Sequence, residues 1–351
     1  MNKKITVIIA CHKACDVPRD PMYLPVQVGS AGKESIPGFA RDDQGENISA
    51  KNPIYCELTG LYWAWKNLDC DYLGLVHYRR YFTSGKIRKK QDKNPFAAVL
   101  SGQEAERLLT RYRVIVPKKR HYYIESVYSH YAHTFDARQF DLTREILQEK
   151  WPAYVPAFDR LMKGSSAWLF NMFLMRKEDA DVYCSWVFQV LQELEKKVDT
   201  KDMTAFEKRY AGRVSERLLN VWLLHRIETG QLEKRDIYEC PYTYLGEVNW
   251  GKKIGGFLKA KFLHQKYSKS FYKRTSSVLL SSSLYNIVLY CKLVAPWRPA
   301  SGAWWLKKYF EKIDTDNKQK QTKFFSEGFA VCCHYFYDCR IARGCFLAAC
   351  G

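Results

Sequence analysis

The chain has 351 residues, a formal net charge of +19 and an aromatic content of 15%. Its length accommodates one large α/β domain with an appendage, or two modest domains. Residues 251–325 contain 16 Lys or Arg and three acids, so about +13 of the charge belongs to that segment. No RNA- or DNA-recognition motif accompanies these basic residues, which argues against a nucleic-acid partner and favours an anionic membrane surface.

The first predicted element is a buried strand at Ile5–Ala10, a short β-branched run that starts without a preceding signal peptide. We therefore expect a cytoplasmic protein whose 12 cysteines are mostly reduced. His12 follows this strand. Residues 28–49 are rich in Gly, Pro and acids and predict a long loop, and loops of this length are usually functional or disordered.

A capped helix at Asn52–Asn67 and a second buried strand follow the loop. Asn52 is a suitable N-cap and Pro53 a suitable first helical residue, because the fixed φ of proline suits that position and its missing N–H is not needed there. The strand Tyr72–Val76 is apolar without alternation, as expected when helices cover both faces of a sheet. It is followed by three polar cations: His77, Arg79 and Arg80. Ligands of open α/β sheets gather at the carboxyl ends of strands, so this cluster marks a candidate ligand site.

The remaining predicted elements alternate between strands and helices. Strands are predicted at Tyr112–Pro117 and Trp168–Met175, and helices at Phe140–Lys150, Glu178–Val198 and Ser215–Ile227. The last two helices have apolar residues at helical spacing, and Ser215 is a suitable N-cap. Alternation of strands and helices over about 240 residues implies an α/β fold with a mainly parallel sheet.

The segments NPIYCELTGLYWAWKN (52–67) and DYLGLVHYRRYF (71–82) resemble the signature of a bacterial family, domain of unknown function 4422, found in capsule and exopolysaccharide gene clusters. Further similar segments follow the family's order: ACHK (10–13), YLPVQVG (23–29), DDQGENIS (42–49), NMFLM (171–175) and RVSERLLNVWL (213–223). The resemblance covers about residues 1–242. It implies a glycosyltransferase with a GT-A-like, nucleotide-sugar-binding α/β fold.

Three segments are expected along the chain. Residues 1–245 form the glycosyltransferase-like domain, residues 246–325 a basic, partly amphipathic helical appendage at the membrane surface, and residues 326–351 a Cys-rich, poorly ordered tail. Residues 275–291 carry no charge but are shorter than the roughly 20 residues of a spanning helix. This favours a helix that lies on the membrane or packs on the domain.

Transfer from a nucleotide sugar requires neutralisation of the departing diphosphate. Arg79 and Arg80 are candidates because a guanidinium binds phosphate oxygens bidentately, and His77 would add a hydrogen bond. The alternative is that one arginine pairs with a structural carboxylate. A divalent metal, Mg²⁺ or Mn²⁺, stays open as a cofactor; Asp69-Cys70-Asp71 has the Asp-x-Asp spelling but precedes its strand, so no metal ligand is assigned.

Further candidates for donor binding are His12 and the loop residues Asp42, Asp43 and Asn47, because acids and amides bind sugar hydroxyls; a solvated loop is the alternative. Three residues are assigned to the pocket: Glu57, Asn171 and Arg217. The family motif singles out Glu216 as the catalytic base, and an acid beside Arg217 is well placed to stay ionised and accept a proton. A capping role for Glu216 is the alternative.

These inferences predict a hexosyltransferase peripheral to the inner face of the plasma membrane. The resemblance implies transfer from a nucleotide-diphosphate sugar to a polyprenyl-linked glycan, with galactose, as pyranose or furanose, one candidate sugar. Two alternatives stay open: transfer of a sugar phosphate on the same scaffold, and a non-catalytic, membrane-docked scaffold or glycan-binding protein of the same pathway.

Overall fold

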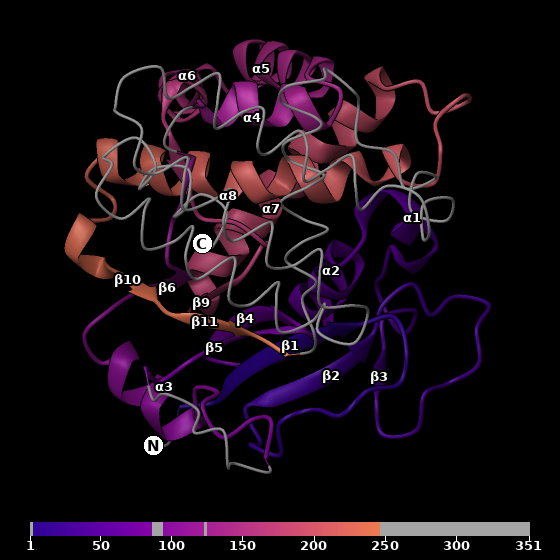
Figure 1. Ribbon diagram of the computed structural model, residues 1–351, viewed down its shortest axis with the longest axis vertical. Coiled ribbons are helices and arrows are strands. Elements are labelled where there is room, and N and C mark those ends of the chain that lie inside the picture. Colours follow the sequence, from indigo (N-terminus) through magenta and orange to yellow (C-terminus); the bar gives the residue numbers. More distant parts are fainter. Residues whose placement is uncertain (1–2, 86–93, 123–124, 246–351) are drawn as a thin grey trace, which may run out of the picture. The chain divides into compact units, whose positions relative to one another are not determined.

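The computed structural model in Figure 1 describes residues 3–85, 94–122 and 125–245. The predictions for residues 246–325 and 326–351 lie outside these ranges. None of the described helices is long and apolar enough to cross a membrane.

A mainly parallel sheet forms the centre of the described domain, in the order β10-β6-β9-β4-β1-β2-β3. Its strands are β1 (Ile5–Cys11), β2 (Tyr23–Gln27), β3 (Ala40–Arg41), β4 (Tyr72–His77), β6 (Val114–Pro117), β9 (Phe173–Arg176) and β10 (Ile237–Cys240). Only β9 runs antiparallel to its neighbours on this path, β4 and β6. Two short strands extend the sheet beside β4: β5 (Arg80–Phe82) and β11 (Tyr242–Tyr244). A separate pair consists of β7 (Arg120–His121) and β8 (Ser166–Ala167).

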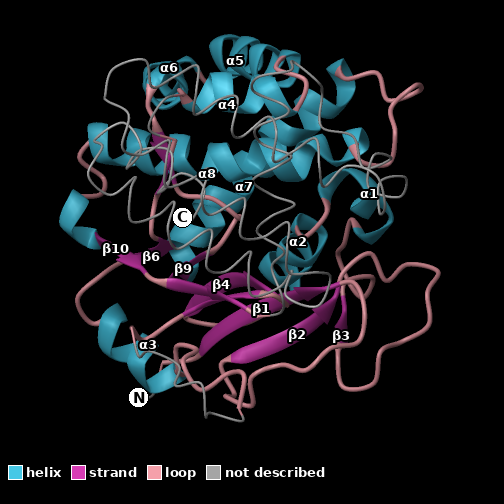
Figure 2. Cartoon of the chain, viewed as in Figure 1, coloured by secondary structure: helices cyan, strands magenta, loops and turns pink. Residues whose placement is uncertain are grey.

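Helices cover both faces of the sheet (Figures 1 and 2). One face carries α1 (Asn52–Tyr55), α2 (Leu58–Asn67), α4 (Val127–Thr134), α5 (Arg138–Lys150), α6 (Val155–Lys163), α7 (Lys177–Lys197) and α8 (Tyr210–Glu228), and the other carries α3 (Gly102–Leu109). Along β1, Ile8 packs in the larger core, whereas Val7 and Ile9 pack in the core beneath α3. Burial on both faces explains why β1 and β4 are apolar without alternation.

The helix predicted at residues 52–67 is interrupted in the structure. Cys56 has φ 54° and ψ −126°, values that no helix adopts, so α1 ends at Tyr55 and α2 starts at Leu58. The Asn52 amide donates to the Cys56 carbonyl (2.7 Å) and to Thr59 Oγ1 (3.1 Å), which stabilises the break. Asn52 is therefore the first residue of α1 and not its N-cap.

Two further boundaries differ from the prediction. The strand expected at Trp168–Met175 starts only at Phe173, because Phe170 and Asn171 have positive φ values of 74° and 53°. The helix expected from Ser215 starts at Tyr210, so Ser215 is a buried residue inside α8 and not an N-cap. Within the described ranges, the other predicted strands and helices are present with small shifts at their ends.

Candidate functional site

The carboxyl ends of β1 and β4 lie side by side, because Ala10 and His77 are paired in the sheet. His12 follows β1 directly, and its ring contacts Tyr78 edge to face with 5.0 Å between centroids. The His77 Nε2–H donates to the carbonyl of Phe170, in the loop before β9. The structure thus brings the two predicted histidines to the sheet edge where open α/β proteins bind ligands.

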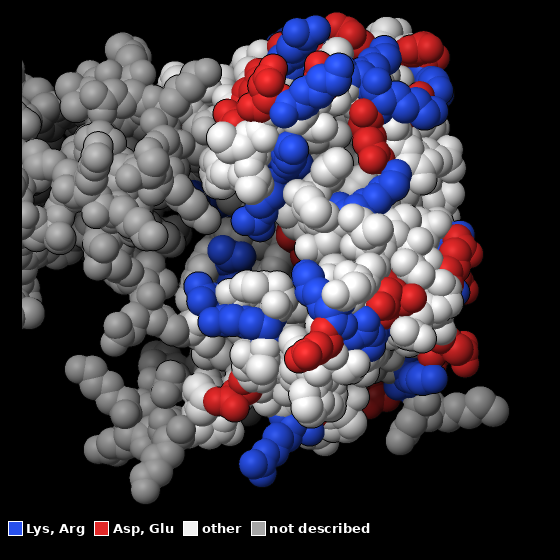
Figure 3. Space-filling model, turned by 90° about the vertical axis from the view of Figure 1, so that its right-hand side faces the viewer, with Lys and Arg blue, Asp and Glu red and all other residues white. Residues whose placement is uncertain are grey.

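Cations gather around His12. The pKa of His12 is lowered by partial burial of its ring and by four nearby cations: Lys13, Arg79, Arg209 and Lys33. They come from the loop after β1, the turn after β4, the residue that precedes α8 and the loop after β2. Figure 3 views the molecule from the side that carries α1 and shows Lys and Arg side chains around a hollow in the described surface. An anionic ligand would relieve the repulsion among these cations.

The neighbouring arginines Arg79 and Arg80 have different surroundings. Arg79 is exposed, lies over the Tyr78 ring at 4.9 Å, and forms no ion pair with any acid in the described ranges. The Arg80 guanidinium lies between the rings of Phe170 (4.5 Å) and Tyr244 (4.8 Å), and its buried Nε has no hydrogen-bond partner there. Arg79 is therefore available to a ligand, whereas Arg80 is packed between aromatic rings.

The acids of the long loop make internal contacts. Asp42 is fully buried and accepts hydrogen bonds from the N–H groups of Gly29 (2.8 Å) and Ser30 (2.9 Å) and from two hydroxyl groups. Asp43 accepts a hydrogen bond from Arg41 at 2.6 Å, which lowers its pKa to about 2. The Asn47 amide donates to two loop carbonyls. These contacts give all three predicted donor-site residues a structural role, and their part in donor binding stays a prediction.

Asn171 connects the sheet edge to α8 and to the start of α2. Its Nδ2 donates to Glu57 Oε1 (2.8 Å) and to the Gly212 carbonyl (2.9 Å). Its Oδ1 accepts from the Ser215 hydroxyl at 3.0 Å. Since Asn171 is buried, this network positions the Glu57 carboxylate at the site.

A second asparagine holds the same loop. Asn220 of α8 accepts from the Trp168 N–H and donates to the Trp168 carbonyl, each at 2.8 Å. Neither Asn220 nor the role of Ser215 was predicted from the sequence. A signal was available for Ser215, because its neighbours at helical spacing, Ala211, Leu218 and Leu219, are apolar, and a polar group on such a face is hydrogen-bonded when buried.

Strained backbone also gathers at this edge. Within the described ranges, the non-glycine residues with positive φ are Cys56, Phe170 and Asn171. Cys56 Sγ accepts from Arg209 Nε at 3.1 Å, and a Cβ at Gly212 would lie 3.1 Å from Cys56 Cβ. Such conformations cost about 1–3 kcal/mol each and are common at functional sites. Their clustering supports the assignment of this edge as the functional site.

Glu216 lies on α8, seven residues after Arg209, which directly precedes the helix. Its carboxylate accepts from Arg217 Nη1 at 2.6 Å, and 21% of its side chain is exposed. Arg217 is buried and its guanidinium lies 5.5 Å from the centre of the Tyr131 ring. Glu216 is thus an accessible, charge-paired acid, and its catalytic assignment stays a prediction.

No group of three or more His, Cys, Asp or Glu is placed to hold a metal ion in the part of the chain that the structure describes. Asp71 stands at the amino end of β4, where its Oδ2 accepts from the Lys4 N–H at 2.7 Å. The Asp69-Cys70-Asp71 sequence therefore lies at the edge opposite the histidines, as its position before the strand indicated.

Comparison with known proteins now identifies the family. The family described as a domain of unknown function, DUF4422, matches residues 6–227. The chain belongs to the DUF4422 family. A solved structure titled as the apo form of the bifunctional glycosyltransferase WbbM is similar, with a TM-score of 0.64 and 28% sequence identity. The match covers 70% of this chain and 46% of that chain, and no curated protein matches.

These findings confirm the predicted family and the predicted GT-A-like α/β fold of the described domain. The DUF4422 match ends at residue 227, within α8, and so includes Glu57, Asn171 and Glu216. Most of the site described above therefore lies inside the family domain.

Proposed function

We propose that this DUF4422 protein is a glycosyltransferase that moves a hexose from a nucleotide-diphosphate sugar to a glycan acceptor in surface-polysaccharide synthesis. The observation that carries the proposal is the cationic carboxyl edge of β1 and β4, where four cations surround His12. Similarity to a glycosyltransferase structure supports the reaction class. Galactose, in pyranose or furanose form, is one candidate sugar.

The diphosphate of the donor would lie against Arg79 and Arg209, which are exposed and come from two different elements. As the bond between the sugar and the diphosphate breaks, negative charge grows on the leaving group, and fixed cations stabilise it. Arg79 offers the planar donor set that suits phosphate oxygens. A divalent ion, Mg²⁺ or Mn²⁺, is the alternative source of positive charge.

The acceptor hydroxyl would approach Glu216, whose carboxylate takes up the proton while the new bond to the sugar forms. The Glu216 carboxylate is held by Arg217 Nη1 at 2.6 Å and keeps 21% of its side chain exposed, so an acceptor hydroxyl can reach it. Glu57 is held by Asn171 and would hydrogen-bond sugar hydroxyls as a pocket residue. Arg209 precedes α8 and Glu216 lies seven residues later on that helix, so a base at Glu216 would lie near the cations that bind the phosphates.

The finer parts of the proposal concern the acceptor and location. A polyprenyl-linked glycan at the inner face of the plasma membrane would suit the basic residues of 251–325, which lie outside the described ranges. Transfer of a sugar phosphate, or a non-catalytic scaffold or glycan-binding role in the same pathway, are the alternatives.

A panel of nucleotide-diphosphate sugars, scored by ligand-induced thermal shift with and without Mn²⁺ and a chelator, tests the proposal. A ligand at 100 times its dissociation constant stabilises a protein by about 2.7 kcal/mol, which gives a clear shift. We expect at least one uridine- or guanosine-diphosphate sugar to stabilise the protein and to be consumed when acceptor is added. Absence of binding across the panel under both metal conditions would contradict the proposal, and binding without transfer would favour the scaffold alternative.

A further inference from the structure

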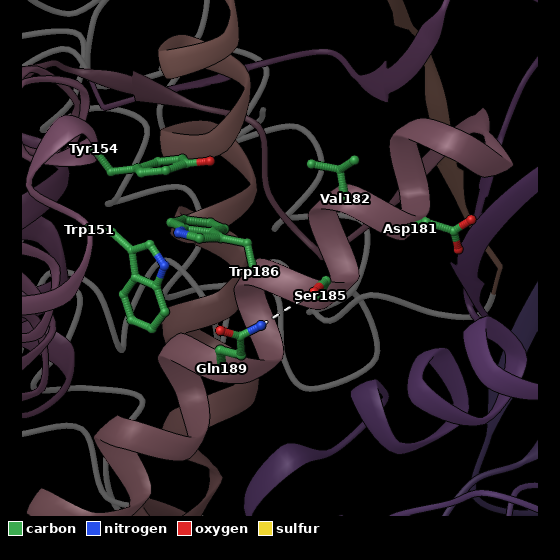
Figure 4. Close-up of a pocket in the computed structure, with 7 residues that line it drawn as sticks. All are labelled: Trp151, Tyr154, Asp181, Val182, Ser185, Trp186 and Gln189. Carbon is green, nitrogen blue, oxygen red and sulfur yellow. Dashed lines mark hydrogen bonds between the residues drawn. The ribbon is translucent and has the colours of Figure 1, made fainter.

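An open groove of about 510 Å³ lies on the helical layer, between α7 and the segment that joins α5 to α6. Its aromatic side chains are Trp151, Tyr154 and Trp186, and Val182 adds an apolar surface that is 45% exposed. Tyr154 stacks on Trp186 with 4.4 Å between centroids. Figure 4 shows the indoles of Trp151 and Trp186 and the Gln189 amide turned toward a common space.

Hydrogen-bonding groups stand among these rings. The Trp186 indole N–H is buried and has no hydrogen-bond partner among the described residues, and only 6% of that residue is exposed. The Gln189 amide donates to the Ser185 hydroxyl at 3.3 Å, which leaves its carbonyl oxygen for another partner. Asp181, ion-paired with Lys177, ends the groove. A buried unpartnered N–H is costly, so its presence beside an open groove points to a ligand that accepts from it.

The groove is separate from the site at the sheet edge. Because β9 runs antiparallel to β4, α7 starts at the amino edge of the parallel strands, opposite His12 and His77. His225, whose ring packs on Tyr154 at 3.9 Å, lies nine residues after Glu216 on α8. A helix rises 1.5 Å per residue, so this separation is about 14 Å along the axis.

We propose that this groove binds a carbohydrate chain. A pyranose ring presents C–H groups on its flat face and hydroxyls around its rim, which matches aromatic rings interspersed with an indole N–H, an amide and a hydroxyl. The groove volume lies within the roughly 300–1,000 Å³ of small-molecule sites and has room for more than one sugar ring. Its rings and neutral polar groups match a neutral sugar better than a phosphate.

The inference rests on the proposed function in one respect, because a glycosyltransferase of polysaccharide synthesis handles a growing glycan. A second binding site about 14 Å away holds that chain after each transfer and raises its effective concentration at Glu216. Longer acceptors would then be used at lower concentrations than short ones.

Binding of linear tetrasaccharides of galactose, glucose and mannose to the full-length protein, measured by calorimetry and saturation-transfer NMR, tests the inference. We expect at least one to bind, Trp151→Ala to weaken that binding about tenfold, and Gln189→Ala to weaken it about two- to tenfold. Tyr112→Ala is the matched control, because Tyr112 is a partly exposed aromatic residue that packs on Tyr238 at the far edge of the sheet. It should leave binding unchanged.

Binding of uridine diphosphate reports on fold and on the sheet-edge site, and should be the same in all three variants. Failure of every tetrasaccharide to bind, or unchanged binding in both groove variants, would overturn the inference. A change of sedimentation in the groove variants without any sugar binding would instead make the groove a contact between copies of the chain. If tetrasaccharides bind the groove while no nucleotide sugar binds the protein, the proposed function fails and this inference stands.

Discussion

The carboxyl edge of the sheet and the helical layer of α5–α8 differ in how their charged side chains are paired. In the helical layer acids and bases are matched, as in Arg144–Asp159 (2.7 Å), Lys150–Glu193 (2.9 Å) and Arg160–Glu228 (2.8 Å). At the sheet edge, Lys13, Lys33, Arg79 and Arg209 surround His12 and form no ion pairs within the described ranges. Matched exposed pairs add little stability and need no ligand. The cations at the strand ends have no acidic partners among the described residues and repel one another, which indicates that they bind an anionic ligand.

The largest expected effect of a substitution is the loss of turnover at Glu216. Glu216→Gln removes the proton acceptor while it keeps the side-chain size, so turnover should fall by about 10²- to 10⁴-fold. Donor affinity and unfolding free energy should stay close to those of the parent. Glu228→Gln, at the far end of the same helix, is the control in the helical layer. Loss of stability in step with activity in Glu216→Gln would assign the residue a structural role.

Asn171 tests whether the strained loop positions the sheet-edge site. Asn171→Leu removes hydrogen bonds to Glu57, Gly212 and Ser215 and places a bulky residue at φ 53°. Loss of a buried partner costs about 1–3 kcal/mol, and the positive φ adds about 1–3 kcal/mol. Urea unfolding should therefore show a loss of about 2–6 kcal/mol. A loss below about 1 kcal/mol would contradict the network described here.

Alanine variants of Arg79 and Arg80 should distinguish a residue that binds the ligand from one that packs in the fold. Arg79→Ala should weaken uridine-diphosphate binding by about 1.5–3 kcal/mol, because it removes a charge-assisted contact from an exposed residue. Arg80→Ala should mainly lower the unfolding free energy, since its guanidinium lies between two rings. Arg144→Ala is the matched arginine from the helical layer and should change neither property by more than about 1 kcal/mol. Equal loss of affinity in the Arg79 and Arg80 variants would contradict this division.

The pH dependence of binding is expected to be the smallest effect. In the free protein the pKa of His12 is lowered by partial burial and nearby cations. A bound diphosphate would raise that pKa, so binding takes up a proton and affinity should rise as the pH falls from 8 to 6. The rise should be less than about tenfold, since one pKa unit corresponds to a factor of ten. His12→Gln should flatten the dependence of affinity on pH. An unchanged dependence would show that His12 is not the group that takes up the proton.

The contribution of His12 to the free energy of unfolding should depend on pH in the opposite direction to its contribution to ligand affinity. Because its pKa is lower in the folded state, the unfolded chain binds the proton more readily. The contribution of His12 to stability is therefore complete above about pH 6.5 and is lost as the pH falls toward the lowered folded-state pKa. Urea unfolding of parent and His12→Gln at pH 8 and pH 5 measures this difference.

Local sequence determined the strands and their place at the site. The apolar runs of β1 and β4 predicted burial on both faces, and the residues that follow them placed His12 and His77 at one sheet edge. Both inferences depend only on neighbouring residues and on the rule that parallel strands end at the same edge. The family signature extended them to the GT-A-like fold, which the comparisons confirmed.

Tertiary structure alone decided which polar residues face a ligand and which hold the fold. Asp42 and Arg80 have the chemistry of ligand-binding groups, yet one is enclosed by loop hydrogen bonds and the other by aromatic rings. Arg209 and Asn171 meet Cys56 and Glu57 only because α8 packs closely at Gly212. Such contacts join residues more than 100 positions apart, and local propensity carries no information about them because they form only when the sheet and helices are packed.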